Sequence, residues 1–244
     1  MRSWGRPLVL EAGNFMEIGT PRAAPVNVLV LNRLEQEGIP AVTPGPRELG
    51  AWPDFTALMR DREIPVVSSN LLVSEGGTSR RIGRRTAVLT VEGVRVGILG
   101  ILGAEAFKRV EAPEGITFSI EDPTATIGEL LPALKSEAEI IVVLGCMTDP
   151  EAAALAGQIP GVDLWISGYD SITSDRPVQR GQTILGRTGQ KGQYLSVTHL
   201  IVSPDGAIVD WGGRNIPLDA KVPADARVDS LVAQLVGGAS GGCH

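Results

Sequence analysis

The sequence is poor in the side chains that most often build catalytic centres. Its 244 residues include only two histidines, His199 and His244, and two cysteines, Cys146 and Cys243. Imidazole is the commonest protein ligand of catalytic metals, and a centre of two metal ions usually draws several. The counts therefore exclude a histidine-rich metal centre, a disulfide-rich scaffold and a zinc site made of cysteine alone.

Long apolar runs and an excess of positive charge are also missing. Uninterrupted apolar stretches are short, such as residues 140–144, whereas a membrane-spanning helix needs roughly 18 residues. With 22 Lys and Arg against 28 Asp and Glu, the net charge is −6. We therefore expect no membrane span and no nucleic-acid partner. The basic cluster at residues 80–85 is interpreted as a solvated turn.

What is present is a chain able to bury a large core, because 43% of its residues are hydrophobic and 20% are charged. Helical periodicity predicts helices at residues 24–37, 52–61, 122–136, 150–158 and 224–235. Short apolar runs predict strands at residues 7–12, 41–43, 64–68, 86–91, 94–99, 140–144 and 162–167. Strands that are apolar throughout, with helices between them, favour a parallel sheet covered on both faces.

The pattern of predicted elements changes after Gly168. Residues 183–187, 194–202 and 207–211 are predicted strands without intervening helices, and the turn Ser203-Pro204-Asp205-Gly206 joins the last two. The chain thus mixes α/β units with antiparallel hairpins. We expect one domain at residues 1–236, followed by a glycine-rich tail at residues 237–244.

Candidate binding residues follow the ends of the buried strands, where parallel α/β sheets hold their ligands. The pocket candidates are Asn14, Arg47, Glu48, Asn70, Cys146, Tyr169, Asp170 and Ser171. Glu48, Cys146, Asp149 and Asp170 could in principle hold one metal ion, but four candidates scattered over three loops favour a structural interpretation.

The order of these segments resembles the calcineurin-like metallophosphoesterases, in particular the catalytic domain of the 5′-nucleotidase group. Residues 8–14 resemble the family strand that ends in Gly-Asp, and residues 39–48 the strand that ends in Gly-Asn-His-Glu. Residues 68–71 are similar to its Ala-Asn-Leu turn, and residues 93–100 to its central hairpin. Residues 138–147 and 161–171 stand where the family has Ser-His-Leu-Gly and Gly-His-Thr-His. The resemblance covers nearly the whole chain and implies a four-layer α/β/β/α sandwich of two mixed sheets.

The metal ligands that the resemblance would bring are replaced. Asn14 stands for the bridging aspartate, and Pro46-Arg47 for the Asn-His pair. Cys146 stands for the next histidine, and Tyr169 and Ser171 for the last two. The family's first strand, with its Asp-x-His pair, has no counterpart before Arg2. Two divalent cations need anionic ligands close by, so we expect no bound metal and no cofactor.

These departures favour a catalytically degenerate domain that acts as a binding or scaffold module for a small anion or a protein. The alternative is a phosphoric ester hydrolase, similar to a nucleotidase, whose metal site is non-standard or incomplete. A third possibility is a redox-associated module joined to a lost cytochrome segment, because the tail Ser240-Gly-Gly-Cys243-His244 is one cysteine short of a haem attachment motif. We do not expect haem at Cys243 and His244, since the chain stops there.

Two residues keep alternatives open. Cys146 precedes a predicted helix whose N-terminus could lower its pKa and make it a nucleophile, or it fills the space of a lost histidine. Arg47 could bind an anion without metal, or pair with Glu48, Asp149 or Asp170 and close the pocket. The resemblance implies export to the periplasm or beyond, but the first residues contain no signal peptide, so the compartment is left open.

Overall fold

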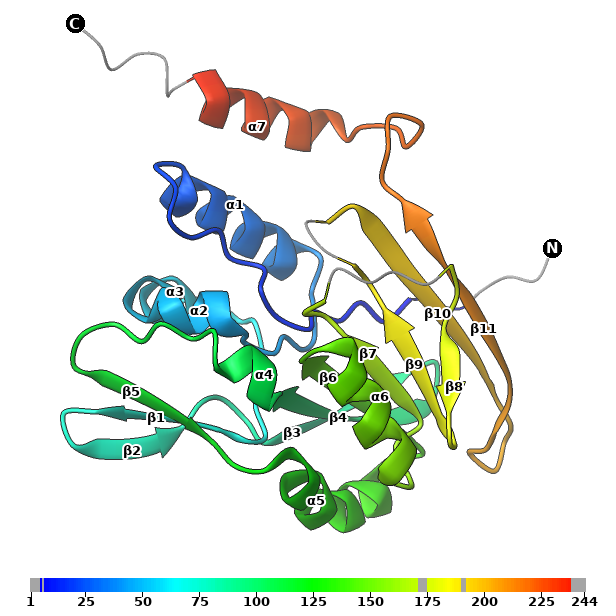
Figure 1. Ribbon diagram of the computed structural model, residues 1–244. Helices are drawn as coiled ribbons and strands as arrows, with labels where there is room; N and C mark the ends of the chain where they lie inside the picture. The colour runs from blue at the N-terminus through cyan, green and yellow to red at the C-terminus, as the bar shows by residue number, and fades with distance from the viewer. Residues whose placement is uncertain (1–4, 6, 171–174, 190–191, 238–244) are drawn as a thin grey trace, which may run out of the picture.

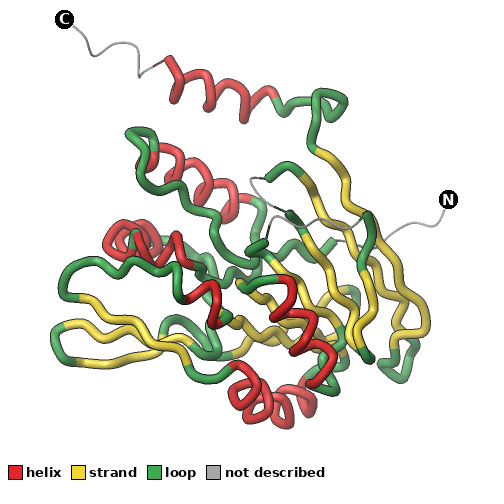
Figure 2. Tube along the Cα trace, in the orientation of Figure 1, coloured by secondary structure: helices red, strands yellow, loops and turns green. Residues whose placement is uncertain are grey.

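The computed structural model describes residue 5 and residues 7–170, 175–189 and 192–237. Strands extend across the molecule from the lower left to the right-hand side of the view, and helices lie above and below them (Figures 1 and 2). This arrangement confirms the predicted mixed α/β class. None of the described helices is long and apolar enough to cross a membrane.

A six-stranded mixed sheet forms the centre of the fold, in the order β3-β4-β6-β7-β9-β8. Its strands are β3 (Thr86–Val91), β4 (Val94–Leu102), β6 (Ile140–Cys146), β7 (Leu164–Ser167), β9 (Thr183–Arg187) and β8 (Val178–Arg180). The neighbours β4, β6, β7 and β9 run parallel, which brings their carboxyl ends to one edge. All seven residues of β6 are buried, as its continuous apolar sequence predicts.

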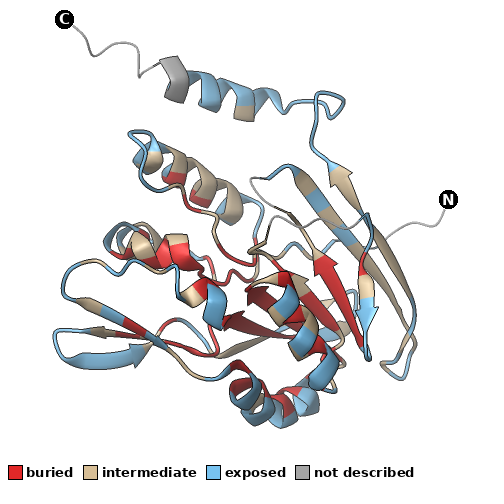
Figure 3. Ribbon diagram, in the orientation of Figure 1, coloured by how far each residue is buried: buried red, intermediate tan, exposed pale blue. Residues whose placement is uncertain are grey.

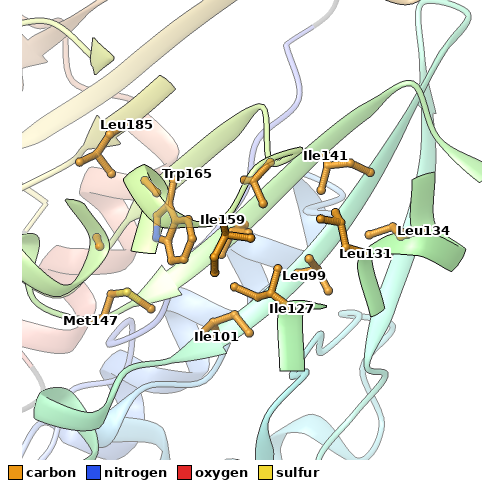
Figure 4. Packing of buried hydrophobic residues seen from close by; sticks show 14 of the residues in the cluster. Leu99, Ile101, Ile127, Leu131, Leu134, Ile141, Met147, Ile159, Trp165 and Leu185 are labelled. Atoms are coloured by element: carbon orange, nitrogen blue, oxygen red, sulfur yellow. The ribbon is translucent and has the colours of Figure 1, made fainter. Parts of the chain in front are cut away.

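One face of this sheet is covered by α5 (Pro123–Glu137) and α6 (Asp149–Gln158). Asp122 caps α5, because its Oδ1 accepts a hydrogen bond from the amide of Ala125 at 2.8 Å. Helix and sheet enclose a core in which Leu99, Ile127 and Trp165 are fully buried (Figure 4). Burial of this kind stabilises the fold by roughly 25 cal/mol per Å² of apolar surface.

The opposite face of the sheet packs against residues 8–12 and against the hairpin of β10 (Tyr194–Val202) and β11 (Ile208–Pro217). Farther out lie α1 (Ala23–Gln36) and α7 (Ala226–Gly237). The described side chains of α7 are almost all exposed, in contrast to the buried strands of the sheet (Figure 3). Residues 8–12 and the hairpin of β10 and β11 are held against the six-stranded sheet mainly by apolar contacts.

A third, smaller sheet has the order β2-β1-β5 and contains β1 (Leu71–Glu75), β2 (Thr78–Arg81) and β5 (Ile116–Ile120). It shares a second core with α2 (Pro46–Gly50), α3 (Trp52–Met59) and α4 (Ala104–Phe107). This sheet corrects the interpretation of residues 80–85 as a solvated turn, because Arg80 and Arg81 lie in β2. Because β2 is polar and exposed, it carries no alternating apolar signal.

Most other predicted elements are confirmed with small shifts at their ends. The exceptions are residues 7–12, 41–43 and 64–68, which do not form regular strands. They join through isolated parallel bridges, Glu11 to Val42 and Val42 to Val66. The apolar runs predict extended chain correctly, but the structure pairs these segments only at single positions.

Candidate functional site

The candidate site lies at the edge where the parallel strands end. Register pairs Leu102 with Cys146, Gly145 with Ser167, and Ser167 with Arg187. Two loops from the bridged segments reach the same edge, residues 13–17 and residues 44–48. The structure brings Asn14, Arg47, Glu48 and Cys146 together here, as the sequence predicts.

Glu48 is the centre of this cluster and is fully buried. It stands at the third position of α2, after the N-cap Gly45 and Pro46. Its Oε2 accepts hydrogen bonds from the amides of Gly45 at 2.8 Å and Asn14 at 2.9 Å, and its Oε1 accepts one from Met16 at 2.8 Å. Burial raises the pKa of Glu48, while these amides act in the opposite direction. The carboxylate thus ties two loops together.

Asn14 is fixed by its backbone conformation and by contacts of its side chain with Arg47 and Cys146. Its φ of 63° is left-handed, which asparagine tolerates better than most residues. Its Oδ1 accepts a hydrogen bond from the amide of Arg47 at 3.1 Å, and its Nδ2 lies 3.8 Å from Sγ of Cys146. The side chain is therefore engaged inside the loop cluster.

Cys146 is completely buried at the end of β6. A Cβ added at Gly45 would lie 2.6 Å from Sγ of Cys146. The thiol therefore fills the space that a side chain at position 45 would need. Burial raises the pKa of Cys146 well above its usual value, and the carboxyls of Glu48 and Glu11 raise it further. This direction is opposite to the one a helix N-terminus would produce. The thiol stays protonated, which favours the space-filling interpretation over the nucleophile.

Glu11 belongs to the same group of acids, although the sequence analysis did not single it out. Desolvation of its carboxyl, reinforced by Glu48, raises its pKa from 4.5 to about 7. The amides of Ala12 and Gly13 oppose this rise. No basic group contributes, so the acidic end of the cluster lacks a cation in the described part of the chain.

Arg47 points away from these acids. Its guanidinium donates to the carbonyl of Met16 at 3.3 Å and lies 3.8 Å from Oε2 of Glu17. The side chain is 44% exposed. The predicted pairing with Glu48, Asp149 or Asp170 is wrong, because α2 turns the side chain outward over the loop that begins at Asn14.

The arginine that pairs with Asp149 is Arg187, at the end of β9. Nε of Arg187 lies 2.8 Å from Oδ2 of Asp149, and both side chains are mostly buried. Asp170 accepts a hydrogen bond from the amide of Asp149 at 2.8 Å. Burial raises the pKa of Asp149, and Arg187 lowers it. A basic residue directly after a buried strand is the signal that could have identified Arg187.

Asn70 and Tyr169 have different surroundings. Asn70 is fully buried and is bound to backbone alone: Nδ2 donates to the carbonyls of Leu102 and Glu121, and Oδ1 accepts from Leu102. Tyr169 packs against the core around Trp52. Ser171 lies outside the described residues. Asn70 is thus a structural residue that joins β1 to β4.

These donors do not fit a pair of metal ions. Both oxygens of Glu48 and the Oδ1 of Asn14 are bound to amides, Cys146 holds its proton, and Asp149 is paired with Arg187. Among the described residues no three His, Cys, Asp or Glu side chains converge as a metal would require. We therefore derive no chemical step through a metal.

Sequence comparison finds no matching family model and no matching curated protein. Comparison of structures does find matches, and they show that the chain has the metallophosphoesterase fold.

Three solved structures illustrate the match. A 5′-nucleotidase precursor from Thermus thermophilus aligns with a TM-score of 0.81 and 17% identity, over 98% of this chain and 50% of that one. The NAD nucleotidase of Haemophilus influenzae gives 0.76 and 16%, over 97% and 58%. The sulfate thiohydrolase SoxB of Thermus thermophilus gives 0.72 and 19%, over 96% and 43%. The chain spans about half the length of these proteins.

Proposed function

We propose that this chain is a non-catalytic domain with the metallophosphoesterase fold, which serves as a binding or scaffold module. The observation that carries the proposal is the engagement of Glu48. A carboxylate that accepts hydrogen bonds from three amides of two loops stabilises the loop junction, and three of its about four acceptor sites are then occupied. Asp149 is engaged differently, by an ion pair in which Nε of Arg187 lies 2.8 Å from its Oδ2.

The test combines metal content with turnover. The purified chain is incubated with Mn²⁺, freed of unbound metal and assayed with p-nitrophenyl phosphate and a nucleoside 5′-monophosphate. We expect less than one metal ion per chain, by elemental mass spectrometry, and no hydrolysis above the protein-free blank.

The alternative function, a phosphoric ester hydrolase with an incomplete or non-standard site, predicts the opposite. The motive for this alternative is that two of the matched proteins are nucleotidases by name. Stoichiometric metal and turnover that disappears in Asp170→Asn, but survives in the control Asp54→Asn on the exposed side of α3, would establish the hydrolase. A haem stain of the same material decides the redox-associated alternative.

Arg47 supports a further part of the proposal, the binding of a small anion. Its guanidinium is half exposed at the mouth of the pocket, and its contact with Glu17 is long. We expect calorimetry to detect weak binding of inorganic phosphate that Arg47→Met removes. Equal binding by Arg47→Met, or none by the native chain, would exclude Arg47 as an anion site.

A further inference from the structure

An open groove of about 2120 Å³ runs from the candidate site along the inner face of the six-stranded sheet. Residues 7–18 and most of β10 line it from two sides. Residues 8–12 of the first lining and β10 are extended chain, and within the described residues each pairs with another strand on one side only. The groove is therefore bordered by two strand edges.

The first edge is formed by residues 8–12. The amide of Glu11 donates to the carbonyl of Ala41, and the carbonyl of Glu11 accepts from the amide of Thr43. In an extended chain the next residues point their backbone groups the other way. Leu10 and Ala12 therefore direct their backbone groups away from residues 41–43.

The second edge is β10, which pairs antiparallel with β11. The amide of Leu218 donates to the carbonyl of Gln193, so the hydrogen-bonded positions of β10 are the odd-numbered ones. In agreement, the amide of Asn215, opposite Ser196, bonds outside this hairpin to Asp175. Ser196, Thr198 and Leu200 therefore point their amides and carbonyls away from β11.

The faces between these edges are apolar. Val96, Val142 and Leu164 of the six-stranded sheet form the floor, with at most 8% of each residue exposed. Val26 and Val30 of α1 also line the groove. A strand buried on both faces is continuously apolar, so a segment that fills this space would be rich in β-branched residues.

The end of the groove at the candidate site is acidic. The carboxyl of Glu48 raises the pKa of Glu11, and no basic side chain of the described chain contributes to that shift. Glu48 is already bound by three amides, whereas Glu11 has only the adjacent amides of its own loop. A cation at this end would complement the charge.

We propose that this groove accepts one extended segment of another polypeptide chain, which adds a strand between residues 8–12 and β10. The segment carries β-branched apolar side chains and, at the end beside Glu11, a lysine or arginine. Main-chain hydrogen bonds to Leu10 and Thr198 supply affinity, and the apolar faces and Glu11 supply selectivity. The inference rests on the fold and the two edges, not on the absence of catalysis.

The test is a binding measurement, so it can fail independently of the metal and turnover assays. A fluorescein-labelled peptide of about six residues, with Lys at one end and alternating Val and Thr, is titrated with the full chain and followed by anisotropy. A second peptide replaces Lys by norleucine. We expect saturable binding of the first peptide and about tenfold weaker binding of the second. In Glu11→Gln the two peptides should bind alike.

Two blocked forms show whether the peptide adds as a strand. Thr198→Pro removes an amide of the open edge without removing a bond to β11, and circular dichroism verifies its fold. A peptide with alternate N-methylated amides blocks the same bonds from the other side. Both should abolish binding, whereas Val209→Ala, on the exposed part of β11, should not.

Four results would overturn the proposal. The first is the absence of saturable binding. The second is binding by Thr198→Pro as tight as by the native chain, together with binding of the N-methylated peptide as tight as of the unmodified one. The third is a dimer of the chain that the peptide dissociates, which would make a second copy the occupant. The fourth is binding only after removal of residues 1–6, which would make the chain's own N-terminus the occupant.

Discussion

The side chain of Glu48 is bound by backbone amides of two loops. Three amides from residues 14, 16 and 45 converge on two oxygens that are shielded from water. A carboxylate satisfied in this way stabilises a loop without forming an ion pair. Glu48 therefore joins the two loops through its side chain.

Replacement of Glu48 by alanine should leave three buried amides without partners. Each costs about 1 to 3 kcal/mol, so we expect a loss of roughly 3 kcal/mol or more in the free energy of unfolding. Glu48→Gln should lose less, since one amide oxygen still accepts. Urea unfolding measures both, with Glu114→Ala on the exposed loop before β5 as the control. A Glu48→Ala chain as stable as the control would contradict the assigned role.

Glu11 should make stability depend on pH in a defined direction. Its pKa is about 7 in the folded chain against 4.5 for the free group, so the folded state prefers the protonated carboxyl. The favourable contribution is complete below pH 4.5 and is lost as the pH rises through about 7.

Glu11→Gln should therefore be more stable than the native chain at about pH 8, by roughly 2 to 3 kcal/mol, and about equal to it below pH 5. Thermal unfolding across this range measures the difference, and Glu114→Gln should follow the native chain throughout. If the Glu11→Gln curve runs parallel to the native one, the carboxyl is not desolvated as described.

At the scale of elements, β4 lies unusually close to the segment at residue 67. A Cβ added at Gly100 would lie 2.0 Å from the carbonyl oxygen of Val67 and 2.6 Å from Oγ1 of Thr43. Backbone cannot move aside as a flexible side chain can. The central sheet and the bridged segments can pack together because position 100 has no side chain.

Gly100→Ala should therefore cost about 3 kcal/mol or more, as an overpacked core position does. Gly128→Ala is the matched control, because a Cβ there meets nothing within 4 Å on the exposed face of α5. That change should stabilise the chain by about 0.5 to 1 kcal/mol through helix propensity. Denaturant midpoints for the pair should move in opposite directions, and movement in the same direction would refute the close approach.

At the scale of the whole molecule, the open edge of β10 should be visible in amide exchange. Val197 and His199 occupy positions that bond to β11, while Ser196 and Thr198 point their amides into the groove. We expect a two-residue alternation along β10, with slow exchange at the odd positions and fast exchange at the even ones. Uniform protection, measured by NMR on the chain alone, would show that the groove is closed.

The sequence predicts the local framework well where the signal is local. Asp122 and Pro123 mark the start of α5, and Glu92 and Gly93 form the tight turn between β3 and β4 with positive φ at both. The three-stranded sheet escapes prediction because β2, residues 78–81, is polar on both faces. The structure brings together the loops of Asn14, Glu48 and Cys146, while the sequence analysis is silent on Glu11 and Arg187.

The sequence by itself determined the buried strands, the helix starts and the shortage of histidine, because each depends on residue type and on neighbours a few positions away. Tertiary structure alone decided that Glu48 binds amides more than thirty residues away along the chain and that Arg187 rather than Arg47 meets Asp149. It also decided that β10 pairs with β11 alone among the described strands. Desolvation and long-range pairing depend on groups that only folding brings together, so the same side chains could not be assigned their roles beforehand.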